Sequence, residues 1–426
     1  MKKSPKKLFY GWSRTTRSKA REIHSMSELS KGECIISRGA GLSYGDAALN
    51  KDNSIITLET LKIDNEFFAG DKSIIVKANQ TILQTLSILK SYNRSLAVIP
   101  GTSRATIGGC VAANVHGKNH HIEGSFSEQV VGFWLQIDSS ASEIYCSDKQ
   151  NHDLFVATFG SHGLTGNLTK VHLKTVEISS AVEVELDFFN DLESMFQIMH
   201  ELSRGDKSFI SLINWSGVKR GSGKIIKYKN LYDANLTIPT PKFSTFMSLS
   251  FPFINPISIR AYNILFFKKS QKTTIKHPHS LWFMADRHKN ANLWFGKNGF
   301  IEYQFSLPWS GKLIAMEVMR DFERHFTIYL SGAKVFGNKS KGLIDFTQEG
   351  FTVTLTTKPT SKLYSKLIEF DKKILQNGGR IYLAKDSRLD SDTFARMYPR
   401  VEELRSLRSK YNLEMFSSDL SRRLKI

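Results

Sequence analysis

The chain has 426 residues, of which 41% are hydrophobic and 23% are charged, a balance that is typical of a folded protein and excludes a disordered or fibrous one. This length is too great for one ordinary core, so two or three lobes are expected. Three cysteines at unrelated spacings argue against a disulfide framework, and no apolar run is long enough to span a bilayer. The cytoplasm is the expected compartment.

Residues 1–180 alternate short apolar runs with helical patterns. Buried strands are predicted at Ser54–Leu58, Ser73–Ala78 and Leu96–Pro100, because turn residues bound each run. Thr81–Tyr92 has apolar residues at helical spacing behind a threonine placed to cap a helix. Leu168–Ile178 alternates as a strand does. An α+β lobe is therefore predicted here.

From residue 181 to 375 the pattern changes. "AVEVELDFF" and "FIEYQFSLP" alternate at period two, which is typical of antiparallel strands with one covered face. Asp191–Gly205 and Lys312–Phe326 are amphipathic and predict helices that flank this sheet. Residues 376–426 follow with a lysine-bearing strand or loop, "IYLAKDSR", and a terminal helix.

Glycine-rich clusters are the strongest functional signal in the first lobe. They are "SRGAGLSYGD" (Ser37–Asp46), "PGTSRATIGGCVAANVHGKNHH" (Pro100–His121) and "FGSHGLTGN" (Phe159–Asn167). Such spacing lets several backbone N–H groups approach a ligand, which is how a protein holds a pyrophosphate with dipoles. Neither of the first two matches G-x-G-x-x-G or the P-loop. Tight turns would explain one cluster, but three in one lobe favour a nucleotide site.

These motifs resemble the PCMH-type FAD-binding lobe of the vanillyl-alcohol-oxidase flavoproteins. Within that group, "HGKNHHIEGSF", "FIEYQF", "AKDSR" and "FSSDLSRRL" resemble the decaprenylphosphoryl-β-D-ribose oxidase family, the FAD-dependent half of a two-protein 2′-epimerase. The resemblance runs from about Gly11 to the C-terminus. It implies an α+β fold with a two-lobed FAD-binding domain over 1–180, a substrate domain over 181–375, and a C-terminal segment, 376–426, that returns to the FAD domain.

The resemblance also implies which residues hold the cofactor. The first two glycine clusters would wrap the FAD diphosphate, and Gly163–Gly166 would cover its adenosine side. The cofactor-binding residues it implies are Arg38, Gly39, Ala40, Gly41, Leu42, Ser43, Tyr44, Gly101, Thr102, Thr106, Ile107, Gly108, Gly109, Asn114, His116, Gly117, Gly163, Leu164, Gly166 and Lys385.

The same resemblance places His116 and Lys118 beside the isoalloxazine ring, with Lys385 at the pyrimidine edge of the flavin. Removal of the hydroxyl proton suits a group that titrates near neutrality, so both His116 and Lys385 stand as catalytic candidates, and the sequence does not rank them. The implied substrate-binding residues are Lys118, Tyr303, Gln304, Lys334 and Thr354.

Two positions depart from the family pattern. Flavoproteins with covalently held FAD often carry a histidine where this chain has Leu42, so dissociable FAD is predicted. Family members known as drug targets carry a cysteine where this chain has Thr354 and an asparagine where it has Thr352, which leaves the exact sugar and carrier open.

A metal site is the alternative explanation for the histidines. His116 and His120 are spaced as two zinc ligands on one helix face. Gly117 argues against a helix there, and no Cys, Asp or Glu cluster completes the ligand set, so no metal is expected. His120 and His121 are then structural, and Cys110 is a small packing residue.

Positive charge is concentrated in one segment. The chain carries a net charge of +19, and the 58 residues from Lys219 to Lys276 hold eleven basic residues against one acid, a net +10. A nucleic-acid surface, a basic face over ordinary core, and a membrane-surface lid each fit this composition. The membrane-surface lid suits a polyprenyl phosphate substrate. In this interpretation the lysines that lie among lipid phosphates are Lys268, Lys269 and Lys272. The apolar residues that enter the lipid are Phe251, Phe253, Ile257, Ile264, Leu265, Phe266 and Phe267.

The predicted function is FAD-dependent oxidation of a sugar hydroxyl, C2′ of a polyprenylphosphoryl pentose (ribose). A separate short-chain NAD(P)H-dependent reductase would complete the epimerisation to the arabinose form. The protein would then be cytoplasmic and peripheral on the inner face of a membrane, with contact through 219–276 and no nucleic-acid partner. The alternative is a soluble FAD-dependent alditol or aldonolactone oxidase.

Overall fold

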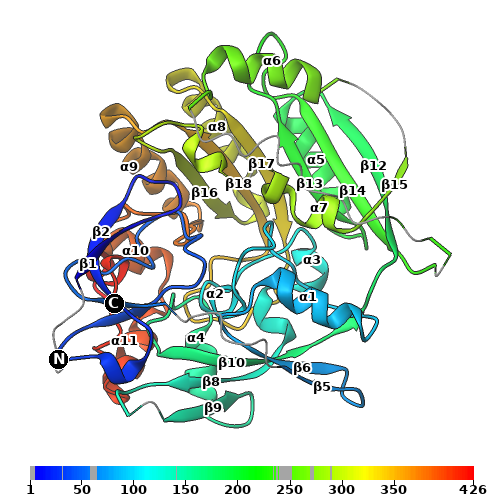
Figure 1. Cartoon of the computed structure of the whole chain (residues 1–426). Coiled ribbons are helices and arrows are strands. Elements are labelled where there is room, and N and C mark those ends of the chain that lie inside the picture. The colour runs from blue at the N-terminus through cyan, green and yellow to red at the C-terminus, as the bar shows by residue number, and fades with distance from the viewer. Residues whose placement is uncertain are drawn as a thin grey trace.

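The structure is a computed structural model that describes residues 5–30, 32–57, 65–140, 142–233, 235–236, 238, 252–268, 273–287 and 290–426. It consists of two lobes and a C-terminal segment (Figure 1). We call residues 5–180 the first lobe, 181–375 the second lobe and 376–426 the C-terminal segment.

Two main sheets form the described part of the first lobe. One has the strand order β1-β2-β4-β3, and the other, which is antiparallel, has the order β5-β6-β10-β8-β9. The strands are β1 Lys6–Tyr10, β2 Arg17–Ile23, β3 Ile35–Ser37, β4 Ser54–Ile56, β5 Asn65–Phe68, β6 Ser73–Lys77, β8 Val130–Gln136, β9 Glu143–Ser147 and β10 Asn167–Lys174. The helices are α1 Ile82–Lys90, α2 Ile107–Ala112, α3 His120–Glu123 and α4 His152–Thr158.

The helix predicted after Thr81 is confirmed as α1. Thr81 accepts the N–H of Gln84, and the Gln84 side chain bonds back to Thr81 as a capping box. The predicted strands at Ser54 and Ser73 are also present, although Leu58 lies outside the described residues.

The prediction of a strand at Leu96–Pro100 is wrong. This run is buried, but its backbone groups bond to side-chain amides and not to a neighbouring strand. Gln129 pairs with the N–H and the C=O of Val98, each at 3.0 Å, and Asn119 donates to Ala97 O at 2.9 Å. The backbone of this run can therefore be buried without pairing to a strand, because the side-chain amides of Gln129 and Asn119 take the place of strand hydrogen bonds.

The second lobe is built on an antiparallel sheet with the order β15-β12-β14-β13-β17-β18-β16-β19, eight strands in the described part of the chain. The strands are β12 Ala181–Phe189, β13 Ser208–Ile213, β14 Gly223–Leu231, β15 Thr274–Lys276, β16 Ile301–Leu307, β17 Leu330–Phe336, β18 Gly350–Thr357 and β19 Arg380–Ile381. The helices are α5 Leu192–Leu202, α6 Pro256–Phe266, α7 His279–Trp282, α8 Lys312–His325 and α9 Ser361–Gln376. The α+β prediction with a helix-flanked antiparallel sheet is confirmed.

The two faces of this sheet have different neighbours. On one face Tyr303 of β16 packs near Phe322 of α8 and Phe370 of α9, and Phe351 of β18 contacts Phe196 of α5. The other face carries Gln304 and Lys334 into the cavity shared with the first lobe, and at β12 and β14 it is covered by Leu281 of α7. Alternation along each strand therefore decides which side chains reach the space between the lobes.

The C-terminal segment returns to the first lobe, with helices α10 Ser391–Met397, α11 Val401–Lys410 and α12 Asp419–Leu424. Ile35 exchanges backbone hydrogen bonds with Met415 (2.7 Å) and Ser417 (2.9 Å). Arg423 binds Asp46 at 2.9 Å and Asp386 at 3.0 Å. This segment thus ties the first glycine-rich loop to residues that follow the second lobe.

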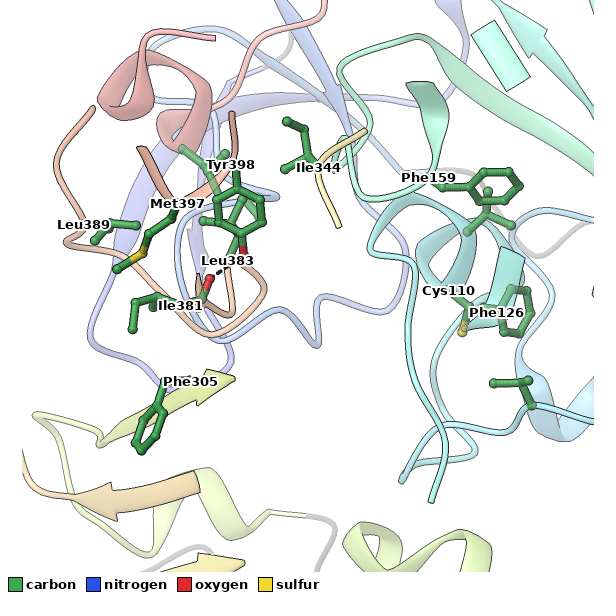
Figure 2. Close-up of a cluster of buried hydrophobic side chains, with 14 of the residues drawn as sticks. Cys110, Phe126, Phe159, Phe305, Ile344, Ile381, Leu383, Leu389, Met397 and Tyr398 are labelled. Atoms are coloured by element: carbon green, nitrogen blue, oxygen red, sulfur yellow. Dashed lines mark hydrogen bonds between the residues drawn. The ribbon is translucent and has the colours of Figure 1, made fainter. Parts of the chain in front are cut away.

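One hydrophobic core runs through all three parts. Figure 2 shows Cys110, Phe126 and Phe159 from the first lobe, Phe305 from β16, and Met397 and Tyr398 from α10 and its end. The Tyr398 hydroxyl donates to Ile381 O at 2.6 Å, the dashed bond of Figure 2. One shared core therefore joins the two lobes and the C-terminal segment.

Candidate active site

An elongated cleft lies between the first lobe, the sheet of the second lobe and the C-terminal segment. It consists of two adjoining cavities of about 350 Å³ and about 250 Å³. Both are lined by Gly39, Thr106 and His162, and the larger one also reaches Lys334 and Lys385. A cleft of this size suits a cofactor together with part of a substrate.

The first glycine-rich loop offers this cleft a row of free backbone donors. From Gly39 to Ser43, five consecutive N–H groups have no acceptor among the residues that the structure describes. The Arg38 guanidinium fixes the loop by donating to Ala48 O at 3.0 Å and to Tyr10 O at 2.8 Å. Unpaired N–H groups that converge on a cavity form an anion-binding surface, so this loop fits a pyrophosphate.

The second glycine cluster closes against the first. Thr106 caps α2 by accepting the N–H of Gly109 at 3.2 Å, and its Oγ1 lies so close to Gly39 that a Cβ there would approach to 2.2 Å. Gly108 donates to Ala78 O at 2.7 Å. The glycines therefore allow two loops to come together around the cleft, where side chains would fill it.

We expect Gly39→Ala to weaken FAD binding by about tenfold, because the new methyl displaces Thr106 and removes the cap of α2. Titration of the apoprotein with FAD, followed by flavin fluorescence, measures the dissociation constant. Gly70→Ala is the matched control, since a Cβ at Gly70 meets nothing within 4 Å. Equal affinity of both variants for FAD would contradict the close approach.

The loop around Gly101 is held by the second lobe. Asp286 accepts from Thr102 Oγ1 at 2.5 Å and from the N–H of Ser103 at 2.6 Å. Gly101 O accepts the N–H of Ala285 at 3.1 Å. The segment that carries Asp286 thus positions the part of the larger cavity that Gly101 and Thr102 line.

Most of the cofactor residues expected from the sequence line the two cavities. They are Arg38, Gly39, Ala40, Gly41, Leu42, Ser43, Tyr44, Gly101, Thr102, Thr106, Gly108, Gly109, His116, Gly163, Gly166 and Lys385. Four others do not line them: Ile107, Asn114, Gly117 and Leu164.

Those four have structural contacts instead. Ile107 and Leu164 are fully buried in core. Asn114 donates to Ser340 Oγ at 2.8 Å and accepts from the N–H of Ser127 at 3.0 Å. A Cβ at Gly117 would lie 2.4 Å from Asn119 Oδ1. These four residues belong to the same glycine-rich segments as the lining residues, and they hold those segments in place from outside the cavities.

His116 and Lys334 form the central pair of the larger cavity. Lys334 Nζ lies 2.9 Å from His116 Nδ1, and the imidazole packs against Phe336 and Tyr382. Burial lowers the pKa of both groups well below their usual values, and nearby lysine charges lower it further: those of Lys334 and Lys385 act on His116, and those of Lys118 and Lys385 act on Lys334. Two neutral groups therefore fit this contact at neutral pH, and a neutral Lys334 can accept the Nδ1 proton.

The other ring nitrogen of His116 is available. Its Nε2 is buried and has no hydrogen-bond partner within the described ranges. With the proton on Nδ1, Nε2 keeps its lone pair and can take a proton from a bound hydroxyl. Acceptance of a proton by His116 Nε2 is therefore the reaction step that the geometry of the site supports best.

Lys385 stands at the other side of the same cavity. Its Nζ is ion-paired with Glu302 and lies 5.1 Å from the centre of the Tyr44 ring. The N–H of Tyr44 donates to Ala384 O at 2.8 Å. A Cβ at Gly45 would lie 1.8 Å from Asp386 O, so only glycine allows this docking. The first glycine loop thus places Lys385.

The expected substrate residues divide between four places. Gln304 lines the cavity with Lys334; its amide donates to Thr352 at 3.1 Å, while its Oε1 lacks a partner among the described residues. Thr354 is opposite Gln304 in register and bonds to Gly332, beside the cavity and not on its wall. Lys118 lines a separate cavity of about 100 Å³ and donates to Trp282 O at 2.9 Å.

Tyr303 does not face the cleft, which corrects its placement from the sequence. Period two puts it on the opposite face from Gln304, where its hydroxyl donates to Asp371 at 3.0 Å. Asp371 is in turn ion-paired with Arg388. Of the adjacent residues in "EYQF", Gln304 therefore lines the cavity and Tyr303 lies in the core.

The sequence analysis gave no role to two ring side chains that line the larger cavity. His162 lines both cavities and has a left-handed backbone, φ 55°, with its pKa lowered to about 4 by burial. Tyr382 lines the larger cavity, stacked on Phe346 with ring centres 4.5 Å apart. The position of His162 between the glycines of "GSHGLTG" was a sequence signal that could have identified it. No sequence signal pointed to Tyr382.

The neighbouring histidines are held by structural bonds. His120 lies 3.0 Å from Ser125 Oγ and accepts the N–H of Gly337 at 3.1 Å. His121 Nε2 lies 3.2 Å from Lys207 O. Within the described residues no group of three or more His, Cys, Asp or Glu side chains is arranged to hold a metal ion.

We expect His120 to make the fold sensitive to acid. Burial lowers its pKa to about 3 from the usual 6.5, so the unfolded chain takes up a proton that the folded chain does not. Its contribution to stability is therefore present above pH 6.5 and lost as the pH falls toward 3. Between about pH 6.5 and about pH 5 the loss is about 2 kcal/mol.

Urea unfolding of wild type and His120→Asn at both pH values measures this contribution. The free-energy difference between the two proteins should shrink by about 2 kcal/mol at the lower pH. His24→Asn is the matched control, because His24 is exposed. A constant difference would show that His120 is not held neutral.

Comparison with known proteins agrees with this geometry. Residues 23–135 match the FAD-binding domain family. The decaprenylphosphoryl-β-D-ribose oxidase of Mycolicibacterium smegmatis is 27% identical over 417 residues, which cover 93% of this chain and 90% of that protein. An uncharacterized protein of Streptomyces coelicolor is 24% identical over 354 residues, 77% of this chain and 95% of that protein. The D-arabinono-1,4-lactone oxidase of Debaryomyces hansenii is 25% identical over 157 residues, 34% of this chain and 28% of that protein.

The unpaired loop donors, the glycine cradle and these similarities define a flavoprotein: the N-terminal part is an FAD-binding domain. The chain is an FAD-dependent oxidoreductase whose residues 23–135 match the FAD-binding domain family. No helix among the described residues is long and apolar enough to cross a membrane.

Proposed function

We propose that the protein oxidises the C2′ hydroxyl of a polyprenylphosphoryl pentose, most simply ribose, to the 2′-keto sugar. The observation that carries the proposal is the His116–Lys334 pair in the cavity between the FAD-binding loops and the sheet. Similarity over 93% of the chain to the mycobacterial oxidase supports the sugar and its carrier. The product would pass to a separate short-chain NAD(P)H-dependent reductase, which completes the epimerisation.

FAD, when bound, accepts the hydride from the carbon that carries the hydroxyl. His116 Nε2 takes the hydroxyl proton, and Lys334 receives the Nδ1 proton in turn. Gln304 Oε1, which is buried without a partner among the described residues, accepts a hydrogen bond from a neighbouring sugar hydroxyl. Lys385 supplies a cationic side chain on the cavity wall, which suits a phosphate-linked sugar.

We further propose FAD-binding, substrate and C-terminal units at 1–180, 181–375 and 376–426, with the FAD held without a covalent bond. Leu42 lines the larger cavity at the position where a histidine would form a link. Acid precipitation tests this: flavin absorbance should move to the supernatant, whereas colour in the pellet would show a covalent bond. A polyprenyl substrate also implies a cytoplasmic protein at the inner face of a membrane.

The test of the reaction is anaerobic mixing of the FAD-loaded enzyme with three compounds. Polyprenylphosphoryl ribose should bleach the flavin; free ribose and arabinono-1,4-lactone should not. Borodeuteride should then place deuterium at C2′ of the product. Bleaching by the lactone alone would replace the proposal with the aldonolactone oxidase alternative.

A further inference from the structure

Helix α6 has an apolar face that no part of the described chain covers. Its inner side carries Ile259, which is 5% exposed and packs with Phe295 and Phe300. Its outer side carries Ile257, Ile264 and Leu265, which are 83%, 67% and 77% exposed. Figure 1 shows α6 on the outer rim of the second lobe.

The outer residues form one stripe with two cations. Ile257, Arg260, Ala261, Ile264 and Leu265 are spaced at i, i+3, i+4, i+7 and i+8 on the helix, and Lys268 follows just beyond its C-terminal end; all six are exposed. A helix at the surface of a globular protein normally turns polar residues outward, so this stripe is apolar where charge is expected. Val218, fully exposed, adds a further apolar side chain on a nearby loop.

The structure narrows the set of residues that the sequence assigned to lipid. Phe253 packs on Trp294 with ring centres 4.7 Å apart, and Phe266 covers Lys224 Nζ at 3.7 Å. Phe266 also contacts Phe267. These three aromatic residues are half-buried against the lobe and are not part of the exposed stripe. Phe251, Lys269 and Lys272 lie outside the described residues.

A groove beside the stripe adds an anion-binding feature. It has a volume of about 530 Å³ and its lining includes Val218, Arg260 and Arg324. Arg220 and Glu323 also line it and are ion-paired with each other. It is also lined by Trp215, which is 8% exposed and whose indole N–H has no hydrogen-bond partner among the described residues. An indole donor and two guanidinium groups are chemically suited to a phosphate.

We propose that α6 and Val218 form a docking surface for an anionic phospholipid bilayer. Ile257, Ile264 and Leu265 enter the boundary between headgroups and acyl chains, and Arg260 and Lys268 contact lipid phosphates. Charge complementarity favours a bilayer over a second copy of the chain, because two such stripes would bring like charges together. This proposal concerns a surface outside the catalytic cleft and goes beyond the reaction proposed above.

The test is co-sedimentation of the FAD-loaded protein with vesicles of phosphatidylcholine and about 30% phosphatidylglycerol. Ile264→Asp combined with Leu265→Asp should weaken binding by about tenfold or more. Ile368→Asp is the matched control, since Ile368 is 54% exposed on α9 and should leave binding unchanged. Arg260→Glu combined with Lys268→Glu should abolish the preference for anionic over neutral vesicles.

Two results would overturn the proposal. One is unchanged vesicle binding by the double aspartate variant. The other is a lipid-free dimer of the wild type, seen by sedimentation velocity, that the same variant converts to a monomer, because the stripe would then be a contact between copies. Flavin reduction by a short-chain, water-soluble substrate analogue should be equal in all variants, so failure of docking is distinguishable from failure of the proposed reaction.

Discussion

His116→Ala should lower kcat by about 10² to 10⁴ while FAD binding is retained. The His116 ring offers a free nitrogen to the cavity, since Nδ1 is occupied by Lys334 and Nε2 lacks a partner among the described residues. Without it, the hydroxyl proton has no acceptor at that position. Stopped-flow bleaching of the flavin absorbance measures the step directly.

The pH dependence separates a base from a merely structural ring. The lowered pKa of His116 keeps its lone pair available below pH 6.5, so activity should be lost only as the pH falls through that depressed value. Once Lys334 is protonated at acid pH, its charge opposes protonation of His116. Lys334→Met removes that charge, so the pKa of His116 should rise and the acid limb of kcat/KM should move to higher pH. An unmoved acid limb would exclude His116 as the base.

His121→Gln is the matched control for this experiment. His121 lies in the same loop and its ring bonds to Lys207 O, so the variant should keep wild-type turnover with at most a modest loss of stability. A large loss of turnover in His121→Gln would indicate that the whole loop, and not the His116 ring, is what the reaction needs.

Lys385→Met should slow reduction of the bound flavin by about 10² or more and should destabilise the fold by about 1–3 kcal/mol. The two effects have different causes. The first is loss of a cation at the cavity wall, where Lys385 stands with Tyr44. The second arises because Glu302, its ion-pair partner, is left largely buried without a counter-charge.

A second substitution separates these effects. Adding Glu302→Gln to Lys385→Met removes the unpaired carboxylate and should restore the urea midpoint toward that of the wild type, while flavin reduction stays slow. Recovery of both would show that Lys385 acts only through the fold. Recovery of neither would show that the pair is not the source of the stability loss.

The sequence by itself determined the features that depend on neighbouring residues. The capping box at Thr81 and the period-two strands β12 and β16 follow from local geometry. So does the glycine loop in which the N–H groups of Gly39–Ser43 have no acceptor among the residues that the structure describes. A pyrophosphate is held mostly by backbone groups, so a short run of residues is enough to predict its site. The cofactor site was therefore the most predictable part of the cleft.

Only the tertiary structure decided which side chains meet. His116 and Lys334 are 218 positions apart, and Lys385 and Glu302 are 83 apart, so no local pattern predicts either pair. Strand pairing turned Gln304 into the cavity and Tyr303 into the core, a difference of one residue that the motif "EYQF" does not encode. Burial also depends on distant packing, which is why Phe266 is covered while Leu265 beside it is exposed. Long-range register and packing set these outcomes, because both are fixed by the whole sheet and not by the residue itself.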